Sequence, residues 1–404
     1  MIIKLAWKNI WRNPTRSLVV IVAIILGLWA GSFIQSFYYG AIDQRVNDVI
    51  KTEISHLQMH HPRFNEDFNI AYSIKDPEAL LDSINKMNQV KAVSQRSIAT
   101  AVISSAAGSA GIKVFGVFPK QEEKITDIKN KIMEGHYFEN SGRTPILISQ
   151  KTAKKLKLAL RSKLVLTFTH LNGDIISAAF RVNGIYKTAN AQYDQANVFV
   201  LANDLNKLAG ISNSAHEIAV LLKSNDDLQM VKKSLQRQNP DLLVETWLEI
   251  VPLMKHAVEM MDRTLAIFIF IILLAVMFGI VNTMLMSILE RYRELGILMA
   301  IGMNKVRVFY LISAETIFLS MIGTPIGLFF GFLTIQYFKV NGINMGVFSE
   351  AFANIGYSSI IFPRLDFINY LRITFQVFFV SIFAAFYPAL KALSLKPIDA
   401  IRKI

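Results

Sequence analysis

The first residues that could bind a metal are histidines, in the stretch HLQMHHP at residues 56–62. Neutral imidazole is a common ligand of zinc and other transition metals, so His56, His60 and His61 suggest a metal cluster. The three positions fit the edge of a strand as well as the face of a helix, and no acidic partner stands at ligand spacing. We therefore interpret them as structural residues and predict no metal site.

The other motifs that carry chemistry are incomplete. His216 and Glu217 lack the second histidine of a zinc-protease helix, because position 220 is Val. The chain has no cysteine, which excludes a thiol nucleophile, a disulfide framework and Cys-type metal sites. There is no G-x-S-x-G elbow, and none of the 20 glycines is followed by the Lys of a P-loop. We predict a chain that is not an enzyme, with no catalytic residue and no cofactor of its own, so that any energy comes from a partner.

Composition points to a membrane protein. Hydrophobic residues make up 52% of the 404 positions and charged residues 18%, and the mean hydropathy is +0.37, which is too apolar for an ordinary soluble protein. A helix that crosses a bilayer needs about 20 mostly apolar residues. We predict four transmembrane helices, at residues 17–38, 264–289, 308–338 and 371–390.

Basic residues flank these helices unevenly, and the asymmetry predicts their orientation. Segments 1–16, 290–307 and 391–404 are rich in Lys and Arg, whereas the loop at 339–370 is not. The positive-inside rule therefore places the three basic segments, and both termini, in the cytoplasm. Residues 39–263 then lie outside and contribute only +4 of the net charge of +13. The basic excess reflects topology and anionic lipid, and we predict no nucleic-acid partner.

The N-terminal segment MIIKLAWKNIWRNPTRS is basic like the start of a signal peptide. The apolar run behind it is too long for a signal peptide and lacks a convincing cleavage site, so we interpret it as a retained anchor. Ile3, Trp7 and Ile10 recur at helical spacing beside Lys4 and Lys8, which predicts a helix in the membrane interface. An unstructured basic flank is the alternative.

Residues 39–263 combine strand and helix patterns. Strand patterns lie at residues 53–59, 98–104, 112–118, 163–169, 175–186 and 198–201. Helical patterns lie at residues 77–87, 150–158 and 226–238. A turn at residues 171–174 predicts a hairpin, and residues 139–143 mark a candidate division into two subdomains. The predicted fold class is an α-helical membrane protein with four transmembrane helices and a large α+β domain inserted between helices 1 and 2.

The loop SILERYRELGILMAIGMNKVRV, residues 287–308, has the pattern of a short amphipathic helix. Charges open it, and an apolar face follows at Leu295, Leu298 and Met299, which suits insertion into a groove on a partner. On physics alone, a simple hairpin between two spans explains the pattern equally well. The residues that we assign to this contact are Glu290, Arg291, Arg293, Glu294, Gly296, Leu298 and Gly302.

Small and polar residues inside the spans predict where helices pack. Glycines at four-residue spacing give the third span a smooth face. We assign helix packing to Asn282, Gly323, Gly327 and Gly331. Glu315 stands at membrane depth, where an ionisable side chain is costly. We expect it to pair with Arg293 or Arg307, or to reach lipid headgroups.

The run VNTMLMSILERYRELGILMAIGMNKVRV at residues 281–308 resembles the signature of the FtsX/MacB-type permease superfamily. In that superfamily an ABC-transporter permease presents a coupling helix to a separate ATPase. Other segments match in order: LAWKNIWRNPTRS resembles the family's N-terminal interfacial helix, EGHYF at 134–138 and ILIS at 146–149 its periplasmic domain, and YPALKALSLKPIDAIRKI at 387–404 its closing motif. The resemblance covers the whole chain.

Chain length, the four spans and the segment ISHLQMHHPRF resemble the permeases of the lipoprotein-releasing (Lol-type) system. The resemblance implies a multi-pass protein of the bacterial inner membrane with its large domain in the periplasm. It also implies three partners: an ABC ATPase that binds ATP and Mg²⁺, a second permease of the same or a homologous chain, and an acylated lipoprotein. A periplasmic carrier receives the lipoprotein in such systems. The family's carrier-binding hook is longer and contains Pro, whereas this chain has LNGDIIS at 171–177.

Acyl chains need apolar surface that is open to the outer leaflet. Aromatic and Met side chains at the outer ends of the first two spans suit flexible chains, although ordinary lipid contact explains the same residues. The candidates are Phe33, Phe37, Tyr38, Met261, Leu265 and Phe268.

Two other functions use the same coupling helix. An FtsX-like regulator would move the outer domain to switch on a periplasmic cell-wall hydrolase. A MacB-like permease would export peptides or amphiphiles through an adaptor. Both stay open beside ATP-driven lipoprotein extraction by mechanical transmission.

Overall fold

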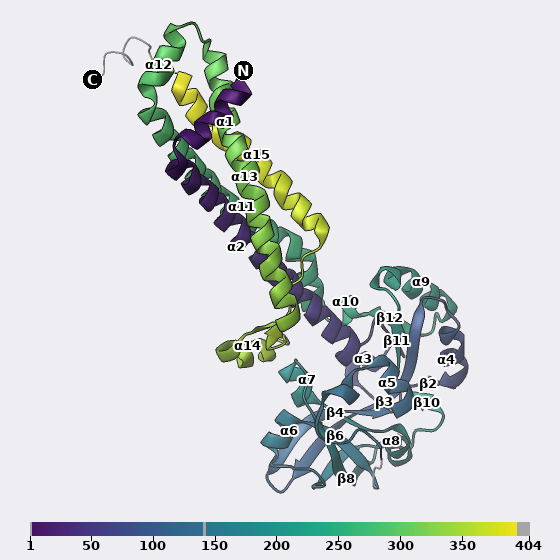
Figure 1. Ribbon diagram of the computed structural model, residues 1–404. Helices are drawn as coiled ribbons and strands as arrows, with labels where there is room; N and C mark the ends of the chain where they lie inside the picture. Colours follow the sequence, from purple (N-terminus) through teal and green to yellow (C-terminus); the bar gives the residue numbers. More distant parts are fainter. Residues whose placement is uncertain (1, 140–142, 394–404) are drawn as a thin grey trace. The chain divides into compact units, whose positions relative to one another are not determined.

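The structure is a computed structural model that describes residues 2–139 and 143–393 (Figure 1). The chain divides into two compact units. The helical unit comprises residues up to 42, residues 258–343 and the chain from residue 360 onward. The α+β unit comprises residues 43–257 and 344–359. Each unit has its own core, as expected where one part faces lipid and the other faces water.

Long apolar helices make up the helical unit. Four are long and apolar enough to span a membrane, and each predicted span lies within one of them. The helices are α1 (Ile2–Arg12), α2 (Pro14–Asp48), α11 (Pro252–Glu290), α12 (Tyr292–Ala300), α13 (Lys305–Asn341) and α15 (Phe367–Leu393). Their outward faces carry exposed Phe, Ile and Leu side chains, such as Phe270 and Phe278 of α11. Hydrophobic side chains on that face are stable only against lipid or another chain.

Three glycines of α13 allow this helix to approach α2 closely. A Cβ added at Gly327 would lie 3.0 Å from the Cα of Ile25, and Gly323 and Gly331 lie against Ile24 and Ser32 in the same way. The three predicted packing glycines therefore line the face of α13 that contacts α2. Because that face is covered within the chain, it is not a free surface for a second copy.

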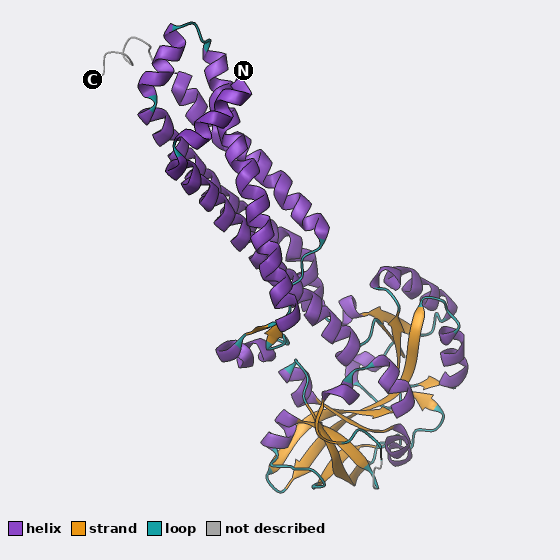
Figure 2. Cartoon of the chain, in the orientation of Figure 1, coloured by secondary structure: helices purple, strands orange, loops and turns teal. Residues whose placement is uncertain are grey.

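One ten-stranded sheet organises the α+β unit, with strand order β12-β1-β11-β3-β4-β9-β6-β8-β5 and β7 paired to β3 and β8 (Figure 2). Its strands are β1 (Leu57–His60), β3 (Val90–Ser105), β4 (Gly108–Val117), β5 (Ile132–Gly135), β6 (Pro145–Ser149), β7 (Lys163–Thr169), β8 (Ile175–Tyr186), β9 (Asn197–Leu201), β11 (Glu217–Leu222) and β12 (Leu243–Thr246). Two small sheets pair β2 (Ile74–Lys75) with β10 (Ser214–Ala215) and β13 (Ile343–Asn344) with β14 (Ile360–Ile361).

Short helices complete this unit. They are the π-helix η1 (Val49–Glu53), the α-helices α3 (Phe64–Asp67), α4 (Pro77–Asn85), α5 (Pro119–Ile125), α6 (Gln150–Lys155), α7 (Ala191–Ala196), α8 (Ala202–Ala209), α9 (Leu228–Gln238), α10 (Trp247–Ile250) and α14 (Ser349–Asn354), and the 3₁₀ turns η2 (Ile128–Lys131), η3 (Asn225–Asp227) and η4 (Gly346–Phe348).

Two strand predictions match the structure closely. β7 and β8 occupy the predicted ranges, and residues 171–174 form the turn between them, with Gly173 at φ +94°. β3 is far longer than the predicted 98–104 because a continuous buried run precedes it. The two-subdomain prediction is wrong, since β5 and β6, which flank residues 139–143, both pair with β8 in one sheet; residues 140–142 themselves lie outside the described part of the chain.

The loop predicted at 339–370 is partly structured and partly belongs elsewhere. Residues 344–359, with η4 and α14, group with the α+β unit rather than with the helices. Lys151 of α6 donates to the side chain of Asn354 at 3.2 Å. Sequence patterns of a short loop carry no sign of such a long-range contact.

The histidines of the 56–62 stretch lie in or beside β1 and have structural contacts. His56 is buried, its Nδ1 accepts from the Leu222 N–H at 3.2 Å, and burial lowers its pKa to about 4. His60 lies 3.2 Å from the backbone oxygen of His216. His61 stacks on Tyr72. Among the described residues, no group of three or more His, Asp and Glu side chains is arranged to hold a metal ion.

The α2–α13 contact gives the first testable prediction. We expect Gly327→Ala to lower the melting temperature of the full chain in detergent by several degrees, because the new methyl meets backbone atoms of α2 and overpacking costs about 1–3 kcal/mol. Gly279→Ala on α11 is the control, since its nearest neighbour is a methyl at 4.0 Å and Ala favours a helix. Equal melting temperatures for the two variants would contradict the packing argument, and intrinsic tryptophan fluorescence measures both.

Candidate functional site

The loop between α11 and α13 folds as a short helix, α12, with a defined start and end. Arg291 alone separates it from α11. At its end, the N–H of Gly302 bonds to the oxygen of Met299 and the N–H of Met303 to the oxygen of Leu298, which is a Schellman motif. Gly302 has φ +102°, where an L side chain is strained. Gly302 is therefore a helix stop that turns the chain toward α13.

The apolar face of α12 contacts the chain's own helices. Leu295 and Gly296 are buried, and Leu298 and Met299 pack against the core of the helical unit. This packing covers Leu295, whereas Leu298 and Met299 are only partly buried, so insertion of the apolar face into a partner stays a prediction. An amphipathic helix buries its apolar face on the nearest apolar surface, which here is the bundle itself.

The opposite face of α12 is exposed. Arg293 is exposed and forms no ion pair with any residue in ranges 2–139 and 143–393. Ile297 and Ile301 lie beside it and are 41% and 80% exposed. This mixed face of α12, which includes the predicted contact residue Arg293, is open to a partner.

Three arginines and three glutamates join α12 to the rest of the helical unit, and we name this group the charged clamp. Its members are Arg12, Arg16, Glu290, Arg291, Glu294 and Glu315. Arg12 at the end of α1 pairs with Glu294 of α12, and Arg16 of α2 pairs with Glu290 at the end of α11. The charged clamp is electrically neutral, which suits a position at the edge of an apolar bundle.

Its centre is the pair between Arg291 and Glu315. Arg291 Nη1 lies 3.1 Å from both carboxylate oxygens of Glu315, and the two side chains are only 11% and 7% exposed. Asn9 Nδ2 donates to Glu315 Oε1 at 2.6 Å. The predicted partners of Glu315, Arg293 and Arg307, are wrong. The sequence could not orient α12, and its helical turn carries Arg291 inward and Arg293 outward.

The outer edge of the charged clamp is more accessible. Glu294 receives hydrogen bonds from Arg12 and from Arg291, the latter at 3.4 Å. The bond from Arg12 is the main reason that the pKa of Glu294 is lowered, so this carboxylate stays ionised at neutral pH. Arg16 also donates to the hydroxyl of Ser287 at 3.0 Å. The contacts of Asn9, Arg12, Arg16 and Ser287 were missed from sequence, where the only signal was a basic segment close to an acidic one.

An apolar groove adjoins α12 on its exposed side. Its volume is ≈ 770 Å³. It is lined by Ile2, Ile3, Leu298, Ile301, Gly302, Met303, Arg307, Tyr310 and Ala314. Ile301, on the exposed side of α12, is part of this lining, and Arg307 supplies a cation.

Two further predictions about site residues need correction. Asn282 is exposed on α11, so it packs against none of the described helices of this chain. Leu265 is buried and therefore not open to an acyl chain, whereas Phe33 is half-buried and lies beside Phe338 of α13 with ring centres 5.9 Å apart. Phe268 is 47% exposed. Phe37, Tyr38 and Met261 are half-buried, and the six candidates therefore do not form one exposed surface.

The charged clamp gives a double-mutant test. Arg291→Gln should destabilise the full chain by about 3 kcal/mol, because it leaves the carboxylate of Glu315 buried without a cation. Arg291→Gln with Glu315→Gln should recover most of that loss, since no buried charge remains. Arg293→Gln is the matched control and should leave thermal stability unchanged. Additive losses in the double variant would contradict a direct Arg291–Glu315 interaction.

Comparison with known proteins shows the family of this chain. Residues 17–238 match the MacB-like periplasmic core domain, and residues 266–397 match the C-terminal part of FtsX-like permeases. An uncharacterised ABC transporter permease of Methanocaldococcus jannaschii is 25% identical over 99% of this chain and 97% of its own length. The lipoprotein-releasing system transmembrane protein LolC of Neisseria meningitidis is 21% identical over 75% of each chain.

A solved structure, the periplasmic region of MacB from Actinobacillus actinomycetemcomitans, aligns with 54% of this chain and 98% of its own at 9% identity and a TM-score of 0.36. The homologues are ABC permeases, and the four apolar helices agree with a multi-pass membrane protein. The match to the MacB-like core domain covers more than half of the chain, and the FtsX-like match covers most of the remainder. The chain belongs to the FtsX/MacB family of ABC transporter permeases.

Proposed function

We propose that this permease transmits the ATP-driven movement of a separate ABC ATPase to its outer α+β unit, and so extracts lipoproteins from the membrane. The observation that carries the proposal is the charged clamp, which pairs α12 with α1, the first residue before α12 with α13, and α2 with α11, while the other face of α12 stays open. ATP and Mg²⁺ are bound by the ATPase. Both termini are cytoplasmic and the α+β unit is periplasmic, as the distribution of Lys and Arg favours.

The ATPase docks on the exposed face of α12 and the adjoining groove. Ile297 and Ile301 supply apolar contact, and Arg293 supplies a charge for an acidic partner residue. A push on this face reaches α13 through the pair between Arg291 and Glu315. From α13 it reaches α2 through the glycine contacts. A buried ion pair and close helix–helix contacts deform little under load. A displacement of α12 should therefore move α13 and α2 by a similar amount.

The two long helices that continue into the α+β unit support the same path for the displacement. α2 and α11 each run through the division between the two units without a break in the helix, at residues 42–43 and 257–258. A continuous helix carries a displacement along its axis better than a loop does. The movement at α12 therefore has two helical paths to the α+β unit.

Lipoprotein is the proposed cargo because relatives along three quarters of this chain are named as lipoprotein-releasing proteins. The hairpin between β7 and β8 closes in a short turn, with the His170 N–H bonded to the Asp174 oxygen at 2.7 Å. A turn of this size offers little surface to a periplasmic carrier. We therefore assign carrier recruitment to the second permease or another chain.

A second permease pairs with this chain through α11. Asn282 is exposed between Phe278 and Met286, four residues to either side on one helical stripe. An amide at membrane depth gains most when it hydrogen-bonds across a helix contact.

Export of peptides or amphiphiles is a second candidate function, favoured by the match to the MacB-like core domain. An FtsX-like regulator of a cell-wall hydrolase is a third, favoured by the match to FtsX-like permeases.

The ATPase contact can be tested by charge reversal. Arg293→Glu combined with Ile297→Asp should reduce co-purification of the ATPase with the tagged chain from its own host by at least tenfold, since a contact of this kind contributes roughly 1.4 kcal/mol or more. Lys339→Glu, an exposed cation at the opposite end of α13, is the control and should leave the yield of ATPase unchanged. Equal yields of ATPase for both variants would exclude α12 as the docking helix.

The cargo is tested by native mass spectrometry of the complex purified through a tag on this chain in mild detergent. Two permeases, two ATPases and an acylated lipoprotein in one assembly support extraction. The mass of the second permease shows whether it is the same chain. A cell-wall hydrolase without acylated cargo would favour the regulator, and an adaptor with an outer-membrane conduit would favour export.

A further inference from the structure

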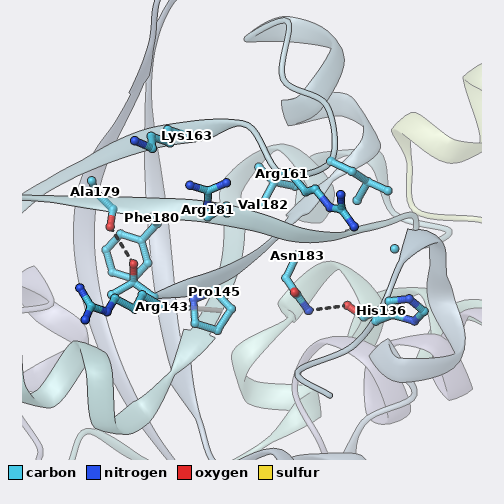
Figure 3. A pocket seen from close by; sticks show the side chains of 13 residues that line it. His136, Arg143, Pro145, Arg161, Lys163, Ala179, Phe180, Arg181, Val182 and Asn183 are labelled. Atoms are coloured by element: carbon cyan, nitrogen blue, oxygen red, sulfur yellow. Dashed lines mark hydrogen bonds between the residues drawn. The ribbon is translucent and has the colours of Figure 1, made fainter. Parts of the chain in front are cut away.

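The α+β unit carries an open groove of ≈ 820 Å³ whose lining is strongly basic (Figure 3). Four of its lining residues are permanent cations, and His136 adds an imidazole. The four are Arg143, Arg161, Lys163 and Arg181, and all are exposed. None of the lining residues is acidic. The groove therefore concentrates positive charge in a concave surface, which attracts anions.

The register of β8 explains why the cations converge. Lys163 of β7 stands directly opposite Arg181 of β8. On the other side of β8, Pro145 of β6 is the partner of Arg181, and the Arg181 N–H bonds to the oxygen of Thr144 at 3.0 Å. The segments that carry Arg143 and Arg161 are thus held against the same part of β8. Like charges directly opposite each other across two strands destabilise a sheet, so this arrangement opposes folding unless an anion is present.

The pleat of β8 directs these side chains outward. Phe180 and Val182 are buried in the core of the unit, whereas Arg181 between them is exposed. Figure 3 shows Arg181 between Lys163, Arg161 and Arg143, which line the groove with it. Two of the four cations, Lys163 and Arg181, therefore lie on paired strands, and little ordering of that backbone is needed before a ligand binds.

Backbone strain marks the same place. Thr144 and Arg161 both have positive φ angles, +48° and +64°, although neither is glycine. A β-branched residue in the left-handed region is a true outlier, and such strain gathers at binding sites where the surrounding structure enforces it. Here the Arg161 N–H bonds to the Val182 oxygen at 2.9 Å, and the Thr144 hydroxyl donates to the Ala179 oxygen at 2.9 Å. Both strained residues line the groove.

The positive charge is not neutralised within the unit. None of the four cations forms an ion pair with another residue of the described ranges. Elsewhere in the unit, a buried arginine is fully paired: Arg96 donates to Glu122 at 2.7 Å and to Glu217 at 2.6 Å. An exposed lysine is paired too, since Lys129 contacts Glu123 and Glu139. Unlike Arg96 and Lys129, the four cations of the groove are therefore available to bind an external anion.

We propose that this groove binds a phosphate-bearing ligand with at least two anionic groups. Arg is suited to phosphate because its planar fork makes two parallel hydrogen bonds to it. The volume of the groove is typical of small-molecule sites, which span about 300–1,000 Å³, and exceeds what a single phosphate fills. Leu160, which is 38% exposed, adds apolar contact for the remainder of the ligand. The source of the phosphate is a soluble molecule or a lipid headgroup.

The test uses the full chain in uncharged detergent, without ATPase, so its result does not depend on the proposed function. Inorganic pyrophosphate is titrated by calorimetry with divalent metals removed. We expect binding that weakens as salt rises, and a loss of affinity of roughly tenfold or more for Lys163→Gln with Arg181→Gln. Lys233→Gln with Arg237→Gln, exposed on α9 and outside the groove, removes the same two charges and should bind like the unaltered chain.

Thermal stability separates a binding role from a structural one. Without ligand, the Lys163→Gln/Arg181→Gln variant should melt at the same temperature as the unaltered chain or higher, because a repulsive pair is removed. Pyrophosphate should raise the melting temperatures of the unaltered chain and of the Lys233→Gln/Arg237→Gln control, but not that of the Lys163→Gln/Arg181→Gln variant. Failure of the unaltered chain to bind pyrophosphate at millimolar concentration, or equal binding by the two double variants, overturns the proposal.

Short-chain lipid monomers identify the source of the phosphate. Dihexanoyl-phosphatidylinositol 4-phosphate, a lipid with two phosphate groups, is titrated in place of pyrophosphate, with the zwitterionic phosphatidylcholine of equal chain length as control. Tighter binding of the anionic lipid than of pyrophosphate supports a lipid headgroup. Binding of pyrophosphate alone supports a soluble ligand. Equal binding of the two lipids, with no effect of the Lys163→Gln/Arg181→Gln substitutions, shows detergent-like partitioning and counts against the site.

Discussion

A carboxylate held at the edge of an apolar helix bundle constrains everything around it. Glu315 is almost fully buried, and its charge is stable there only because Arg291 and Asn9 reach it from α12 and α1. That requirement fixes the rotation of α12, the position of α1 and the entry of α13 together. The other pairs of the charged clamp extend the same constraint to α2 and to the end of α11. The helix that we propose to meet the ATPase is therefore attached by charge to α1 and, through Arg291, to α13.

This attachment separates the two faces of α12. Leu295 and Gly296 are used for internal packing, so they set where the helix lies. The exposed residues take no part in this internal packing and remain accessible; they are Arg293, Ile297 and Ile301. The two kinds of residue alternate within nine positions, because 3.6 residues complete a helical turn. A short helix thus combines a rigid support with a contact surface.

Charge is handled in opposite ways in the two units. In the charged clamp, cations and anions are equal in number and lie within contact distance. In the groove on β6, β7 and β8, four cations gather on one surface without an acid among them. Balanced charge at a buried place stabilises a structure, whereas unbalanced charge at an exposed place lowers its stability and favours a ligand of opposite sign. The two arrangements therefore indicate different roles: mechanical connection in one unit and ligand binding in the other.

Several features followed from sequence alone. The four apolar helices were predictable because a bilayer demands about 20 consecutive apolar residues. β7 and β8 were predictable because alternation of exposed and buried residues is a local property. The glycine ladder at Gly323, Gly327 and Gly331 marked a packing face for the same reason. The run at 281–308 carried the family resemblance on its own.

The tertiary structure decided which residues meet. Arg291, rather than Arg293, pairs with Glu315, because a difference of two positions is about 200° of rotation on a helix and sequence does not set its zero. Asn282 faces outward and Leu265 inward for the same reason. The groove of Arg143, Arg161, Lys163 and Arg181 was invisible in sequence, since strand pairing brings together residues up to 38 positions apart. Sequence determines each segment's local periodicity, but the phase of a helix and the register of a strand are settled only when distant segments pack.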